Sequence, residues 1–177
     1  MDTQQYWDLI DEARRTATDA ADAGAVAERA AALLAARPRA EILGAQQAFW
    51  DLMADSYRAE LWAAAYLVNG GCSDDGFEYF RGWLVLQGRE VFERAVAEPD
   101  SLAALPAVRT AAADGEELEC EDALGIAWEA HRTAAGEDLP DGCFTITYPA
   151  IQFDRDFEDE AETARRLPCL AALFAQD

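Results

Sequence analysis

The stretch from residue 56 to residue 92 constrains the fold of this chain more than any other part of the sequence. It reads SYRAELWAAAYLVNGGCSDDGFEYFRGWLVLQGREVF, with large apolar residues three or four positions apart on both sides of a glycine-containing centre. Residues at this spacing lie on one face of an α-helix. The stretch therefore predicts two amphipathic helices joined by a tight loop.

Helical spacing also runs through the sequence that precedes this stretch. We expect a first helix to begin at Asp2 or Thr3 and a second helix to end before Pro38. The pattern then continues from residue 40 to residue 68, which is long for one straight helix in a compact domain. We therefore expect a break near residues 54–57.

After the loop, the same pattern predicts two further long helices. One is expected to begin at Ser73 or Asp74 and to continue to about Ala97, where a proline follows. The other is expected to begin at Glu116 and to end at Gly136, because glycine tolerates the left-handed conformation at a helix C-terminus.

Residues 137–153 interrupt the helical pattern with prolines and glycines. Their FTITYPAIQF segment is rich in β-forming residues and leaves open a minor extended segment near residues 144–148. No partner strand is evident elsewhere, and a last helical segment over residues 165–174 is interrupted by Pro168. Taken together, the patterns predict a single all-α domain over residues 1–177, with six or seven helices.

The chain is strongly acidic, with 35 Asp and Glu residues against 14 Arg and no Lys, for a formal charge of −21. A nucleic-acid-binding protein needs a basic face, so we expect no nucleic-acid partner. Anionic membrane surfaces would also repel this chain, so we expect no membrane partner. Two interpretations of the acidity remain open: a surface that keeps the protein soluble, or a surface that binds a basic protein.

Targeting and redox features favour a cytoplasmic protein. The N-terminal MDTQQYWDLIDEARR has no basic region followed by an apolar one, as a signal peptide would, and we expect no membrane-spanning helix. Four widely spaced cysteines, none in a CxxC pair, are typical of reduced thiols. These are Cys72, Cys120, Cys143 and Cys169.

Several segments resemble a bacterial family catalogued as domain of unknown function 4240. They are YWDLIDEAR, SYRAELWAAAYLVNGGCSDDGFEYFRGWLVLQGREVFERAVAEPDSLA, ECEDALGIAWEAHRTAAGEDLP and DFEDEAETARRLPCLAALF. The resemblance implies a small, mostly helical, bacterial cytoplasmic domain, and it supplies no catalytic residues. Residues 16–48 and 141–153 match least, so we expect features particular to this protein there.

The loop between the two central helices is the first candidate functional element. It could present a thiol and carboxylates at a helix N-terminus, where the helix dipole lowers the pKa of a thiol. It is equally a capped helix start after a glycine-rich turn, which requires these residue types for backbone reasons alone. The candidate loop residues are Asn69, Gly70, Gly71, Cys72, Ser73, Asp74 and Asp75.

A pocket beside this loop is the second candidate. Its expected residues are Glu78, Arg81, Trp83 and His131. The single histidine, His131, makes a Cys–His pair with Cys72 the one combination available for nucleophilic catalysis, although its helical face suits a partly buried residue. A buried arginine at a cleft would suggest anion binding. No dinucleotide, P-loop, serine-hydrolase or zinc-protease motif is present, so we expect no catalytic residues, cofactor or metal.

The absence of a catalytic set and the strong negative charge together favour a non-catalytic function. We expect an acidic cytoplasmic protein that binds another protein, as an accessory, regulatory or neutralising partner. The alternative is an enzyme or small-ligand-binding protein with a pocket around residues 70–81. A concave pocket that holds Asp74, Arg81 and His131 together would favour the alternative, and the sequence does not fix the oligomeric state.

Overall fold

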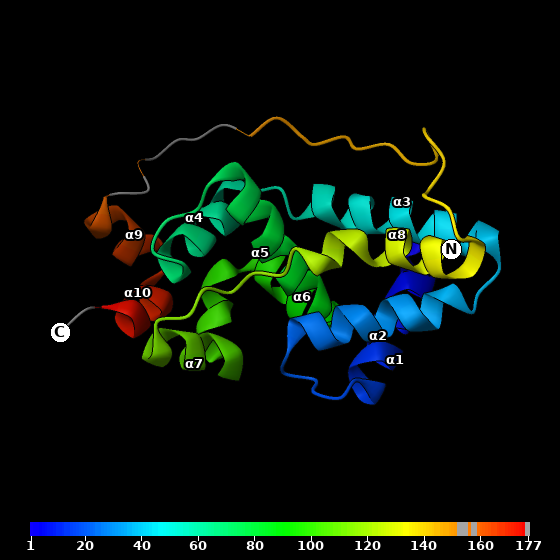
Figure 1. Cartoon of the computed structure of the whole chain (residues 1–177). Coiled ribbons are helices and arrows are strands. Elements are labelled where there is room, and N and C mark those ends of the chain that lie inside the picture. The colour runs from blue at the N-terminus through cyan, green and yellow to red at the C-terminus, as the bar shows by residue number, and fades with distance from the viewer. Residues whose placement is uncertain (152–155, 157–158, 176–177) are drawn as a thin grey trace.

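A computed structural model describes residues 1–151, 156 and 159–175 of the chain (Figure 1). Within these residues, ten α-helices and one 3-10 helix account for all regular secondary structure, and there is no strand. The helices are α1 Thr3–Thr16, α2 Ala23–Ala35, α3 Arg39–Asp55, α4 Ala59–Val68, α5 Asp74–Leu86, α6 Arg89–Ala97, η1 Pro99–Ala104, α7 Pro106–Asp114, α8 Asp122–Ala135, α9 Glu160–Arg166 and α10 Pro168–Phe174. The predicted all-α fold is confirmed.

The predicted helix ends are confirmed where a side chain or a glycine fixes the backbone. The Asp2 side chain accepts a hydrogen bond from the Gln5 backbone N–H at the start of α1, and the Asp2 backbone N–H donates to Gln5 Oε1. Gly136 ends α8 in the left-handed conformation, with φ of 72°. The break expected near residues 54–57 lies between α3 and α4, where the buried Ser56 hydroxyl donates to the Leu52 carbonyl oxygen.

The predicted number of helices, six or seven, is wrong because apolar spacing continues across breaks that the sequence pattern does not reveal. The helix expected from residue 73 to about residue 97 is divided into α5 and α6 at Gly88, which has φ of 92°. The helix expected from Glu116 begins only at Asp122. Residues 144–148 form neither helix nor strand and continue the chain in an extended course (Figure 1).

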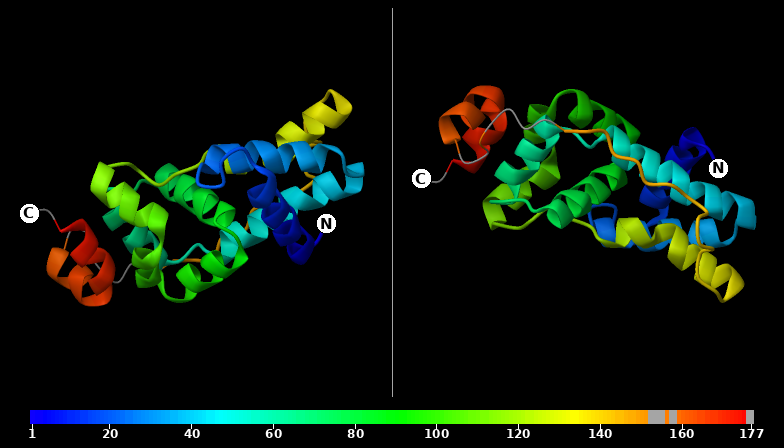
Figure 2. Two further views of the ribbon diagram at one scale, coloured as in Figure 1. Left: turned by 90° about the horizontal axis from the view of Figure 1, so that it is seen from below. Right: turned by 90° about the horizontal axis from the view of Figure 1, so that it is seen from above.

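The helices form an elongated bundle with one continuous hydrophobic core (Figure 2). At one end α2 packs along α8, with α1 and α3 against them, and at the other end α10 packs on α4, α7 and η1. α5 crosses the middle and contacts both groups. Four of the five tryptophans are buried in this core, and Trp128 is 36 % exposed.

Residues 116–121 run along α5 at very short distance. A Cβ added to Gly82 would lie 2.8 Å from the Cys120 carbonyl oxygen, so only glycine fits there. The Cys120 backbone N–H also donates to the Tyr79 carbonyl oxygen over 3.0 Å. This contact holds the start of α8 beside α5 and brings together the acidic residues of both elements.

Candidate functional site

Each residue of the candidate loop has a structural role. The Asn69 side chain accepts from the Leu118 backbone N–H and donates to the Leu118 carbonyl oxygen, over 2.9 Å and 3.3 Å. Gly70 and Gly71 have φ of 64° and 131°, which other residues rarely adopt. The Ser73 hydroxyl accepts from the Gly76 backbone N–H and caps α5. Asp74 and Asp75 are exposed in the first turn of α5, where carboxylates are favourable.

Cys72 and His131 do not form a catalytic pair. The pKa of the Cys72 thiol is raised to about 12 by burial, an effect that nearby Arg81 opposes and Glu117 adds to. This is the opposite of the lowering expected at a helix N-terminus, and it leaves the thiol protonated at neutral pH.

His131 is fully buried near the C-terminal end of α8, at the opposite end of the bundle from the α4–α5 loop (Figure 1). Its Nε2 accepts from Arg39 Nε over 3.2 Å, so Nδ1 carries the proton and donates to the Glu137 carbonyl oxygen over 2.9 Å. His131 therefore fastens the end of α8 to the start of α3. Among the described residues, its hydrogen-bond partners Arg39 and Glu137 are not those of Arg81, and the structure does not bring His131, Asp74 and Arg81 together.

Arg81 is a buried arginine, with 1 % of its surface exposed. Its Nη1 donates to the Met53 carbonyl oxygen over 2.6 Å and its Nε to the Phe77 carbonyl oxygen over 3.2 Å. The guanidinium carbon lies 4.6–5.1 Å from the ring centroids of Phe77, Tyr148 and Tyr57. No carboxylate of the described residues forms an ion pair with it. Aromatic faces and carbonyl oxygens thus stabilise this charge.

Tyr148 connects Arg81 to Glu78. Its hydroxyl accepts from Arg81 Nη2 over 3.5 Å and donates to Glu78 Oε1 over 2.7 Å, and its ring stacks on Tyr57 at 4.4 Å. Burial raises the pKa of Tyr148 to about 12, against the lowering effect of Arg81, so the phenol stays protonated and donates at neutral pH. Two of the expected pocket residues, Glu78 and Arg81, are therefore brought together by a residue that the sequence did not indicate.

Tyr148 belongs to an extended segment, residues 143–151, that we call the strap. The strap crosses α3 (Figure 2). The Thr145 backbone N–H donates to Gln47 Oε1 over 2.8 Å, and the Thr145 carbonyl oxygen accepts from Gln47 Nε2 over 3.2 Å. The Phe144 ring stacks on Trp50 at 6.3 Å. We call the surface beneath it, formed by Gln47, Trp50, Tyr57 and Arg81, the strap groove.

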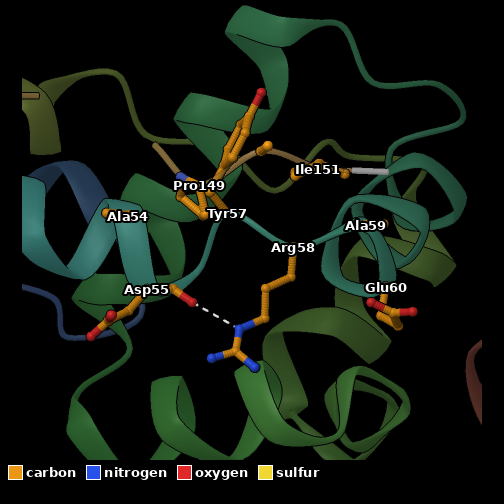
Figure 3. Close-up of a pocket in the computed structure, with 9 residues that line it drawn as sticks. Ala54, Asp55, Tyr57, Arg58, Ala59, Glu60, Pro149 and Ile151 are labelled. Carbon is orange, nitrogen blue, oxygen red and sulfur yellow. Dashed lines mark hydrogen bonds between the residues drawn. The ribbon is translucent and has the colours of Figure 1, made fainter. Parts of the chain in front are cut away.

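The end of the strap borders a pocket of about 620 Å³ at the break between α3 and α4 (Figure 3). Pro149, Ala150 and Ile151 line it together with residues 54–60 of the break apart from Ser56. Arg58 Nε donates to the Asp55 carbonyl oxygen over 2.9 Å, as Figure 3 shows. The pocket holds neither Arg81 nor His131, and its wall depends on the strap staying in place.

A second hollow, of about 910 Å³, lies between α2, α5 and the start of α8, and we call it the acidic groove. The described residues that line it include no arginine and six carboxylates, from Asp22, Glu28, Glu78, Glu121, Asp122 and Glu129. Among the described residues, only Glu129 of these six is in an ion pair, with Arg132 at 3.9 Å. The Glu121 carboxylate, with Asp75 and Glu78, raises the pKa of the half-buried Tyr79 in the same hollow.

The remaining predicted features lie elsewhere. Trp83 is 3 % exposed and packs on Phe80 in the core, outside both hollows. Over the described ranges, no three His, Cys, Asp or Glu side chains are grouped as a metal site requires. No helix of the described chain has the length and apolarity to cross a bilayer.

Sequence reasoning missed the strap groove because its residues are far apart in the chain. Tyr148 lies 67 positions from Arg81, and Thr145 lies 98 positions from Gln47. The one available signal was the cluster of aromatic and β-branched residues in FTITYP, an apolar segment without a helical or strand partner.

Comparison with known proteins yields a family and no activity. The family model described as "Protein of unknown function (DUF4240)" matches residues 1–133. No curated protein and no solved structure matches the chain. Residues 16–48, expected to resemble the family least, lie inside the matched range. The expected resemblance of DFEDEAETARRLPCLAALF and the divergent segment 141–153 lie beyond it, and residues 152 and 153 are outside the described part of the structure.

Proposed function

This chain belongs to the DUF4240 family of proteins of unknown function, and since no activity comes with that membership, we propose a function from the residues themselves. The protein binds a basic protein partner through the acidic groove, without catalysing a reaction. Its role is that of an accessory, regulatory or neutralising partner.

The observation that carries this proposal is that the described residues lining the acidic groove include no basic side chain. Asp22 and Glu28, the cap and a residue of α2, and Asp122 at the start of α8 converge on one hollow beside Glu78 and Glu121. Like charges held together repel one another, and partners with arginine or lysine side chains would relieve this repulsion. A surface that served solubility alone would gain nothing from concentrating its charges in a concavity.

Other features support a non-catalytic role in the bacterial cytoplasm. The Cys72 thiol is held protonated, and His131 is occupied by two hydrogen bonds. All four cysteines are free thiols, which suits a reducing compartment.

The proposal is tested by affinity capture from a bacterial extract at two salt concentrations. The groove variant is Glu28→Gln/Glu121→Gln, and the matched control is Asp114→Asn/Glu116→Gln, which removes two exposed carboxylates outside the groove. A partner should be retained by the wild type and the control at 0.1 M salt. It should be lost from the groove variant, and from every form at 1 M salt, where the Debye length falls from about 10 Å to about 3 Å.

Equal capture by the groove variant and the control would contradict the proposal. Capture that is unchanged at 1 M salt would show that the acidity is incidental to binding.

A further inference from the structure

The strap is held in its groove by the same kinds of contact that hold an extended peptide on a receptor. The Gln47 side-chain amide accepts a hydrogen bond from the Thr145 backbone N–H and donates one to the Thr145 carbonyl oxygen. Phe144 and Tyr148, four positions apart, insert rings against Trp50 and Tyr57. Between these anchors Ile146 is 47 % exposed, and Thr145 and Thr147 are also exposed. Main-chain hydrogen bonds with spaced side-chain pockets are a recurring mode of peptide recognition.

The strap fits this groove incompletely. The indole Nε1 of Trp50 is buried without any hydrogen-bond partner among the described residues, which costs free energy relative to a satisfied donor. Arg81 Nη2 reaches its acceptor, the Tyr148 hydroxyl, only at 3.5 Å. A peptide that approached with a better-placed acceptor would satisfy donors that the strap leaves unsatisfied or weakly bonded.

The groove and its occupant belong to different parts of the chain. Gln47, Trp50, Tyr57 and Arg81 all lie within the residues that match the family, whereas the strap lies beyond residue 133. The groove thus lies in the range that matches the family model, and the segment that covers it lies outside that range.

We propose that the strap groove is a binding site for an extended peptide of a partner protein, with an aromatic residue four positions before a tyrosine. The strap occupies the site in cis and competes with that peptide. Phe144 and Tyr148 define the two aromatic positions, Gln47 binds the backbone between them, and Arg81 and Glu78 bind the tyrosine hydroxyl. This site shares Glu78 with the acidic groove, but its proposal rests on Gln47, Trp50 and Arg81 and does not depend on the function proposed above.

The test measures binding in trans of a labelled peptide with the strap's own sequence, FTITYPA. The full-length Phe144→Ala/Tyr148→Ala variant, which lacks both anchors, should bind the peptide at least about tenfold more tightly than the wild type, where the tethered strap competes at high effective concentration. Adding Gln47→Ala to that variant should weaken binding by about tenfold, since two hydrogen bonds are lost. A control peptide, FTYITPA, has the same composition with the rings two positions apart. It should bind at least about fivefold more weakly than FTITYPA.

A second variant keeps the test decisive if removal of both rings unfolds the protein. Thr145→Pro removes the N–H that donates to Gln47 and retains both rings, and it should also bind the peptide more tightly than the wild type. The exposed Thr147→Ala is its control and should bind like the wild type.

Three results would overturn the proposal. One is no binding of FTITYPA to either strap variant when circular dichroism shows it folded. Another is equal binding to the wild type and the variants. The third is a wild-type dimer in sedimentation that the strap variants abolish, because it would assign the groove to the strap of a second copy.

Discussion

The acidic groove and the strap groove lie on two sides of α5 and differ in the charge that each contains. On one side Glu78 faces a hollow where several carboxylates have no ion-pair partner in the described part of the chain. On the other side Arg81 is buried without an ion pair to any described carboxylate, beneath aromatic rings and a segment of the same chain. One groove is open and anionic, and the other is covered and holds the buried Arg81.

This contrast teaches that composition describes only one of the two sites. A net charge of −21 already indicates that carboxylates will dominate the solvent-exposed surface. It gives no indication of the buried cation, whose environment depends on the chain returning to α3 after α8. Glu78 belongs to both sites, because it lines the acidic groove and accepts the Tyr148 hydrogen bond.

The largest predicted effect is on stability and comes from the buried cation. Arg81→Ala leaves the Met53 carbonyl oxygen without its donor and a cavity among three rings, so we expect a loss of about 2–4 kcal/mol in the free energy of unfolding. Arg89→Ala is the matched control: Arg89 forms an exposed pair with Glu93, and its loss should cost less than about 0.5 kcal/mol. Urea titration measures both. Similar losses would remove the distinction between buried and exposed arginines.

The next effect concerns the loop that leads into the shared helix. Ser73→Ala removes the cap of α5 and should cost about 0.5–2 kcal/mol. Asp74→Ala removes only a favourable first-turn charge and should cost about 0.3–1 kcal/mol. If thermal unfolding shows the larger loss for Asp74→Ala, the assignment of Ser73 as the cap is wrong.

A smaller effect is expected at alkaline pH in the strap groove. The folded-state pKa of Tyr148 lies near 12 against 10 when unfolded, so its contribution is fully present below pH 10 and is lost as pH rises through 12. Two pKa units correspond to about 2.7 kcal/mol, and because the ring is only half-buried we expect about 1 kcal/mol. Tyr148→Phe should lack this part of the decline in unfolding curves recorded at pH 9–12. An identical decline in both proteins would exclude this contribution of Tyr148 to stability.

The smallest predicted effect on stability belongs to the acidic groove. The Glu28→Gln/Glu121→Gln variant should change the free energy of unfolding by no more than about 0.5 kcal/mol, because these are surface carboxylates and their removal relieves repulsion. Calorimetry of this variant beside Asp114→Asn/Glu116→Gln tests it. A marked destabilisation confined to the groove variant would mean that these carboxylates have a structural role.

Local features of the fold could be predicted from single residues, whereas the sites could not. Ser73, Gly70 and Gly71 fix their own backbone environment, and the break near residue 56 follows from the length of the apolar pattern. The division at Gly88 was missed because the apolar spacing continues in phase across it. Gln47 and Tyr148 were missed because contacts between residues about a hundred positions apart leave no periodic signal in a sequence.

The most direct test of the proposed function maps where a cationic ligand binds to this acidic chain. A six-residue arginine peptide, titrated at 0.1 M salt and followed by amide chemical shifts, should perturb residues 22–28, Tyr79 and residues 121–129 first and most. Perturbations spread evenly over all acidic residues, or greatest at exposed carboxylates outside the groove such as Asp114 and Glu116, would contradict the acidic groove as the partner-binding surface.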